Sequence, residues 1–202
     1  LRKTYEKILE LVSSEFQEKC RTTIDDCLDM VRIELEKAME KKEFADEVRS
    51  KTLAYSGEIL MSYMMEYILQ SQGIKSKVVG LDNWPIITDS NIESTNFLAS
   101  ESNKKIEFLE KLLDENQVIT IGGFIGRTTD GIITTYERGG SDRTAADLGI
   151  LLHKKFDVKI DLEKDSAVVS ADPRIVKDGL TEVRSISYNE ARLAGMFGMN
   201  IL

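Results

Sequence analysis

The chain has 202 residues, of which 42% are hydrophobic and 31% charged, a composition typical of a folded globular protein. Its formal net charge of -8 argues against a nucleic-acid partner, because binding to a phosphate backbone requires a basic surface. No apolar run approaches the roughly 20 residues of a membrane helix, so we expect no membrane partner. Binding of a small anionic ligand stays possible, because backbone amides, a metal ion and a few local cations suffice for it.

The N-terminal part of the chain is predicted to be helical. Apolar residues at helical spacing predict one helix over residues 3 to about 20 and a second helix capped by Thr23. A third helix is expected to start near Gly57 and to end before Gly73, a glycine suited to terminate a helix.

The cysteines and methionines of these helices indicate packing rather than chemistry. Cys20 and Cys27 are seven residues apart, which places both on one helix face as small apolar side chains. The sequence contains no CxxC pair and no Cys/His cluster, so we expect no zinc site and a reducing, cytoplasmic setting. The cluster of Met61, Met64 and Met65 is interpreted as core filling.

Strands alternate with helices in the rest of the chain. We expect helices over residues 103–114, after Ser141 and from near Tyr188, and strands at 77–81, 118–121, 131–135, 157–162 and 167–170. This alternation predicts an α/β layered fold with a largely parallel sheet.

A glycine-rich segment, Gly122-Gly123-Phe124-Ile125-Gly126, follows directly after the predicted strand 118–121. Its glycines allow the backbone to approach a ligand closely, and ligands of α/β sheets bind at the carboxyl ends of strands. The spacing fits neither the P-loop nor the dinucleotide-binding fingerprint, and an ordinary glycine-rich turn is the alternative.

A second candidate segment is Arg138-Gly139-Gly140-Ser141-Asp142, at the start of a predicted helix. Ser141 suits the N-cap position, and the two glycines expose backbone donors before a helix N-terminus, an arrangement that attracts anions. Arg138 adds a guanidinium suited to a carboxylate or a phosphate. The alternative is a capped helix with a surface arginine.

Two shorter segments and the single histidine complete the candidates. Glu58, in Ser56-Gly57-Glu58, either favours a helix dipole or presents a carboxylate to a substrate ammonium. Taken alone, the segment Asp172-Pro173-Arg174 is typical of a turn. His153 lies late in a predicted helix, so no histidine-based triad is expected. Glycine turns, an arginine and carboxylates suit phosphoryl transfer, which depends on positioning and charge neutralisation.

Together and in this order, these segments resemble the aspartate kinase branch of the amino-acid kinase family. The resemblance covers roughly residues 54 to 202 and is most specific between Gly123 and Asp142. The matching segments are Ser56–Glu58, Ile87–Asp89, Gly123–Gly126, Asp130-Gly131, Thr134-Thr135, Arg138–Asp142 with Thr144-Ala145, Ala171–Val176, Ile186–Ala191 and Phe197-Gly198.

The resemblance implies a three-layer αβα sandwich with a largely parallel central sheet, plus an N-terminal helical portion. It implies transfer of the γ-phosphoryl group of ATP, with Mg²⁺, to the side-chain carboxylate of L-aspartate, in a cytoplasmic homo-oligomer without a protein-bound metal site. The substrate-binding residues would be Glu58, Phe124, Arg138, Ser141 and Asp142, with Arg138 on the carboxylate and Glu58 on the ammonium. The nucleotide-binding residues would be Gly122, Gly123, Gly126, Gly139, Gly140 and Arg174.

The sequence also departs from the family pattern. The lysine- and glycine-containing phosphate segment is expected upstream of residue 1, so we interpret residues 1–202 as a catalytic domain without it and without a C-terminal ACT region. This domain would comprise a helical subregion, 1–50, and a motif-bearing α/β core, 51–202. Leu162–Ala167 replaces a nucleotide-site segment, Asn200 replaces a lysine, and Tyr136-Glu137 replaces leucine-glycine. Two alternatives stay open: a family member acting on a different carboxylate, and a catalytically inactive regulatory homologue.

Arg138→Ala tests the substrate prediction. Loss of a bidentate contact to the substrate carboxylate should raise the KM for aspartate or abolish turnover, at a cost on the order of 2–4 kcal/mol. Steady-state kinetics measure this effect. Parent-like turnover of aspartate by the variant would show that the prediction is wrong.

Overall fold

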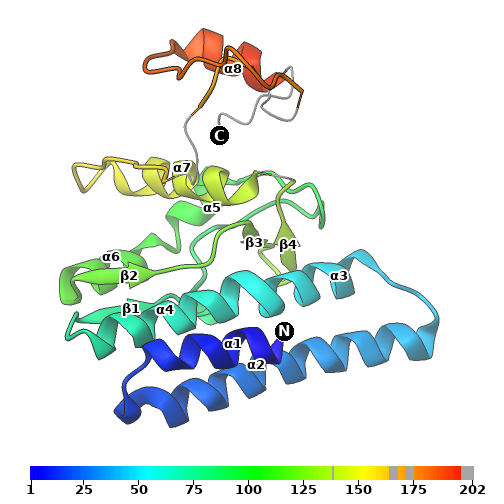
Figure 1. Ribbon diagram of the computed structural model, residues 1–202. Helices are drawn as coiled ribbons and strands as arrows, with labels where there is room; N and C mark the ends of the chain where they lie inside the picture. The colour runs from blue at the N-terminus through cyan, green and yellow to red at the C-terminus, as the bar shows by residue number, and fades with distance from the viewer. Residues whose placement is uncertain (138, 164–167, 172–174, 197–202) are drawn as a thin grey trace. The chain divides into compact units, whose positions relative to one another are not determined.

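In the computed structural model, helices dominate the first 75 residues of the chain (Figure 1). The structure describes residues 1–137, 139–163, 168–171 and 175–196. Two units, Leu1–Lys159 and Ile160–Leu202, are distinguished by their internal contacts, and each is considered by itself. Among the described residues, no helix is both long and apolar enough to cross a membrane.

The N-terminal helices differ from the predicted ones in where they break. Helix α1, Arg2–Ile8, continues into a 3₁₀ turn, Leu9–Leu11, and α2 then runs over Ser14–Lys41. The break lies at Val12 and Ser13, whose backbones are extended. Thr23 caps no helix, which corrects the prediction, because it lies inside α2 and donates its hydroxyl to the carbonyl of Lys19 at 3.0 Å.

The next helical stretch contains an irregular turn. Helix α3, Asp46–Leu53, passes through a π-helical turn, Ala54–Glu58, into α4, Ile59–Ser71. The predicted start near Gly57 is therefore wrong, because the chain is already helical there. The predicted end is confirmed, since Gly73 follows α4 with a left-handed φ of 78°.

Helix α4 contributes to both hydrophobic clusters of the first unit, since Ile59 belongs to one cluster and Leu60 to the other. The helical cluster comprises Tyr5, Leu9, Val12, Cys20, Ile24, Cys27, Leu60 and Met64. The larger cluster comprises Ala54, Ile59, Val79, Trp84, Ile86, Ile106, Leu109, Leu112, Ile125, Ile133, Tyr136 and Leu151.

The cysteines pack as predicted, and the methionines do so only in part. Cys20 and Cys27 are buried, and burial raises the pKa of each thiol to about 11, so neither is a thiolate near neutral pH. Met64 is fully buried against Cys20. Met61 and Met65 are 36% and 39% exposed, so core filling is wrong for these two.

Two small sheets lie beyond α4 in the first unit. Strand β1, Ser76–Val78, pairs in parallel with β2, Val118–Thr120, in the register Ser76 to Val118. Strand β3, Ile125–Arg127, pairs antiparallel with β4, Ile133–Thr135. Part of the glycine segment is therefore a strand, and the strand predicted over 131–135 starts only at Ile133.

Short helical elements connect and cover these strands. A 3₁₀ turn, Leu81–Asn83, ends the strand expected over 77–81 early. Helices α5, Ala99–Asn103, and α6, Ile106–Glu115, replace the single helix expected over 103–114. Helix α7 spans Gly140–Leu152. The first unit thus consists of an N-terminal helical portion followed by a part in which helices and strands alternate, as predicted for an α/β fold.

The second unit contains one described helix, α8, Tyr188–Met196, as predicted. Ser187 and Glu190 form a capping box, in which the Glu190 amide donates to the Ser187 hydroxyl and the Glu190 carboxylate accepts from the Ser187 amide at 2.9 Å. The strand expected over 157–162 does not form, and within the described residues 168–170 only Val169 makes a bridge, to Glu182.

The carboxylate of Asp89 organises the loop over residues 89–96. It accepts hydrogen bonds from the backbone amides of Asn91 and Asn96, both of their side-chain amides, and the hydroxyl of Thr95. These bonds, led by that from the Asn96 side chain, lower the pKa of Asp89 to about 2. The loop also holds β4, because the Ile92 carbonyl accepts from the Thr135 amide at 2.7 Å.

Asp89→Asn should lower the free energy of unfolding at pH 7 by about 1–2 kcal/mol, a value limited by solvent screening. The folded pKa is depressed, so this stability is present above the unfolded pKa and is lost as pH falls toward about 2. Urea unfolding of parent and variant over pH 2–7 measures the difference.

Asp82→Asn is the control, because the Asp82 carboxylate makes no hydrogen bond or ion pair with another described residue. Equal pH dependence of the parent and Asp89→Asn proteins would contradict the prediction.

Candidate active site

Three segments singled out in the sequence meet at the carboxylate of Glu58. One carboxylate oxygen accepts a hydrogen bond from the backbone amide of Gly123 at 3.0 Å. The other accepts from the hydroxyl of Ser141 at 3.1 Å. The π-helical turn, the glycine segment and the start of α7 are therefore joined at one side chain.

The glycines of this site allow the close approach that the hydrogen bonds require. A Cβ at Gly123 would lie 2.8 Å from the Cβ of Ser141 and 2.9 Å from its Cα. A Cβ at Gly122 would lie 3.0 Å from the carbonyl group of Glu58. Larger residues at either position would push the three segments apart.

Phe124 holds the glycine segment to its neighbours through its backbone. Its φ of 66° is left-handed, a strained conformation for an aromatic residue. Its amide donates to the hydroxyl of Thr144 at 3.0 Å, and its carbonyl accepts from the amide of Tyr136 at 2.9 Å. Helix α7 and the segment that precedes it therefore both fix the position of Phe124.

Helix α7 begins differently from the prediction. The N-cap residue is Gly139, with a left-handed φ of 86°, and Ser141 lies within the first turn of the helix. The prediction of Ser141 as the cap is wrong, because its hydroxyl donates to Glu58 instead. Because the N-cap residue is glycine, no side-chain oxygen at this position accepts from the first-turn amides. The acidic residue of the first turn is Asp142.

Other predicted site residues lie elsewhere or outside the described residues. Gly126 is in β3, where a Cβ would lie 2.3 Å from Cγ2 of Thr88, so this glycine permits close strand packing. His153 follows the last residue of α7, as predicted. Arg138, Arg174, Asn200 and the replaced residues Lys164–Ala167 lie outside the described residues.

Tyr136 and Asp147 form a buried pair that was not predicted from the sequence. The Tyr136 hydroxyl donates to the Asp147 carboxylate at 2.7 Å, and both residues are at most 5% exposed. Burial is the main cause that raises the pKa of each group. The available signals were the unusual Tyr136 before Arg138 and a carboxylate on the inner face of α7.

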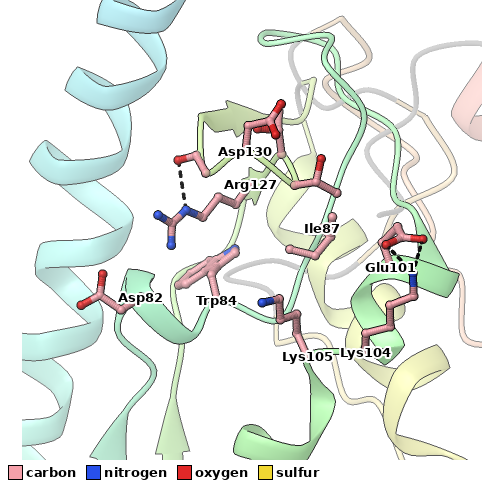
Figure 2. A pocket seen from close by; sticks show the side chains of 11 residues that line it. Asp82, Trp84, Ile87, Glu101, Lys104, Lys105, Arg127 and Asp130 are labelled. Carbon is pink, nitrogen blue, oxygen red and sulfur yellow. Dashed lines mark hydrogen bonds and ion pairs between the residues drawn. The ribbon is translucent and has the colours of Figure 1, made fainter.

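A separate hollow of about 350 Å³ lies between the β3–β4 turn, α5 and the 3₁₀ turn (Figure 2). The guanidinium of Arg127 donates to the carbonyls of Leu81 at 2.6 Å and Gly131 at 3.0 Å, so it ties two sides of the hollow together. Of the predicted substrate- and nucleotide-binding residues that the structure describes, none lines this hollow. Within the described ranges, His, Cys, Asp and Glu side chains form no group of three or more suited to a metal ion.

Gly123→Ala tests the close approach of the segments. The new methyl group would overlap the backbone of Ser141, so we expect a loss of about 1–3 kcal/mol in the free energy of unfolding. Gly57→Ala is the matched control, because apart from its own helical backbone and chain neighbours no atom lies within 4 Å of its Cβ position. Chemical denaturation compares the two variants, and equal stability of both would contradict the prediction.

The chain matches known proteins over most of its length. Residues 7–202 match the profile of the amino acid kinase family. A bifunctional aspartokinase/homoserine dehydrogenase 2 of Arabidopsis thaliana is 34% identical over 160 residues, 78% of this chain and 17% of that protein. An aspartokinase of Rickettsia felis is 32% identical over 148 residues, 73% of this chain and 35% of that protein.

The fold is shared with solved aspartokinases. The structure of E. coli aspartokinase III in complex with aspartate and ADP superposes with a TM-score of 0.80 at 24% identity, over 96% of this chain and 41% of that one. The chain thus covers between about a sixth and two fifths of the length of these relatives. Since the family profile covers nearly all of its residues, the chain belongs to the amino acid kinase family.

Proposed function

We propose that this chain is the catalytic part of an aspartate kinase, which transfers the γ-phosphoryl group of ATP to the side-chain carboxylate of L-aspartate. The observation that carries the proposal is the meeting of Glu58, Gly123 and Ser141. Two of these residues were predicted to bind the substrate and one the nucleotide, and they come from segments separated by 65 and 83 positions.

Glu58 is suited to bind the substrate ammonium group. Each of its two oxygens already accepts one hydrogen bond, which fixes the orientation of the carboxylate. A carboxylate oxygen can accept a further bond, so capacity is left for an ammonium donor. In the proposal Arg138 binds the substrate carboxylate, with Phe124, Ser141 and Asp142 completing the substrate site.

The start of α7 is suited to bind phosphate. Gly139 begins the helix without a side chain, and amides at a helix N-terminus favour anions. The proposal assigns Gly122, Gly123, Gly126, Gly139, Gly140 and Arg174 to the nucleotide. Mg²⁺ bound to the phosphates would neutralise charge on the transferred group, while the protein orients donor and acceptor.

The likeness to a relative solved with aspartate and ADP supports the same pair of ligands here. In this proposal residues 1–202 form an amino-acid kinase catalytic domain. We also propose that the protein is a homo-oligomer and is located in the cytoplasm.

Glu58→Gln tests the proposal in the full-length protein, with ADP release measured by a coupled assay. Loss of the negative charge should raise the KM for aspartate at least tenfold, about 1.4 kcal/mol or more, and leave the KM for ATP within about twofold. Glu47→Gln is the control, because Glu47 lies in α3 and pairs with Lys51 on the surface.

A panel of aspartate, glutamate and carbamate separates the alternatives. Turnover of another acceptor in preference to aspartate would replace the proposed substrate. A parent protein that binds ATP in calorimetry without turning over any acceptor would overturn the kinase proposal in favour of an inactive homologue.

A further inference from the structure

Tyr136 is buried at the junction of two of the three segments that meet at the candidate site, the glycine segment and the start of α7. It is 1% exposed and lies between β4 and α7. Its amide donates to the carbonyl of Phe124 at 2.9 Å. A Cβ at Gly140 would lie 2.4 Å from the Cβ of Tyr136 and 2.8 Å from the ring of Phe124. Tyr136 is therefore in close contact with both the glycine segment and the first turn of α7.

A buried phenol needs a hydrogen-bond acceptor, and α7 supplies one from its second turn. The Asp147 carboxylate accepts from the Tyr136 hydroxyl at 2.7 Å and is itself only 5% exposed. The Arg143 guanidinium lies 5.0 Å from the centre of the Tyr136 ring, and its Nε is 4.0 Å from the Asp147 carboxylate. One cation thus partly compensates the buried carboxylate.

The hydrogen bond between Tyr136 and Asp147 joins the segment before α7 to the helix itself. It connects Tyr136, four residues before the first residue of α7, to Asp147, about two turns inside the helix. The neighbouring residue Glu137 is also held, since its carboxylate accepts from the Ser94 hydroxyl at 2.6 Å and its carbonyl from the Gly140 amide at 3.0 Å. The backbone that leads into the candidate site is therefore fixed on both sides.

We propose that Tyr136 and Asp147 are positioning residues for the aspartate site, which hold the first turn of α7, with Ser141, against the glycine segment and Glu58. Arg143 supports the pair by balancing its charge. Neither residue touches substrate in this role. The inference rests on the proposed function for its kinetic effect, whereas its structural effect is independent of the reaction.

The kinetic test compares Asp147→Leu, Asp147→Asn and Tyr136→Phe in the full-length protein. Asp147→Leu removes the acceptor, so the KM for aspartate should rise about 5- to 20-fold. The KM for ATP should rise as well, because the first turn of α7 and the glycine segment also contain residues assigned to the nucleotide. Asp147→Asn keeps an acceptor oxygen and should recover a KM within about threefold of the parent. Tyr67→Phe is the control, because it removes a hydrogen bond to Thr23 between α2 and α4.

A second measurement is hydrogen exchange at the amides of Gly123 and Gly140, which bond to Glu58 and Glu137 in the parent. Exchange should accelerate at least tenfold in Asp147→Leu and Tyr136→Phe, and remain parent-like in Asp147→Asn and Tyr67→Phe.

These measurements separate a failure of the inference from a failure of the proposed function. Folded Asp147→Leu and Tyr136→Phe proteins with parent-like exchange at both amides would overturn the inference, as would a lowered Tm with an unchanged KM for aspartate. If the parent turns over no aspartate, the proposed function fails and the exchange data alone decide. If Asp147→Leu does not fold, Tyr136→Phe decides by the same criteria.

Discussion

The carboxylate of Glu58 is the interaction on which the candidate site depends. It bonds to residues 65 and 83 positions away in the sequence, and its two oxygens contact different segments. A single acidic side chain at the end of a π-helical turn therefore sets the relative position of the glycine segment and α7. Hydrogen bonds to a charged acceptor are stronger than neutral ones, which suits this joining function.

Close backbone packing and buried hydrogen bonds stabilise the segments that the Glu58 carboxylate joins. Glycines at 122, 123 and 140 let backbones approach where a methyl group would collide. Thr144 adds a further bond, because its hydroxyl donates to the Gly140 carbonyl at 2.9 Å and accepts from the Phe124 amide. The loop anchored by Asp89 holds β4, and β4 leads directly into Tyr136. Structure outside the site thus limits how the site can move.

The sequence predicted the helical N-terminal portion, the end of α4 at Gly73, the buried cysteines and α8, because each rests on local spacing or local backbone preference. Its resemblance to the amino-acid kinase family also predicted that Glu58, the glycine segment and Ser141 belong to one site. It did not predict the π-helical turn, the β3–β4 hairpin or the role of the Ser141 hydroxyl. These features depend on contacts between distant segments, which override a local preference for capping or turns. Tyr136 and Asp147 were missed for the same reason, since neither residue suggests the other from 11 positions away.

The π-helical turn between α3 and α4 has a consequence for how the family can vary here. Such a turn holds one more residue than the α-helix would and absorbs it locally, so α3 and α4 keep the faces that they bury. Deletion of one residue between Ala54 and Glu58 would leave a regular helix with both of these faces in place. The side chains of the turn itself would lose their present spacing, and with it the placement of the acidic side chain that meets Gly123. A shorter turn would therefore disturb the candidate site while the surrounding core stays packed.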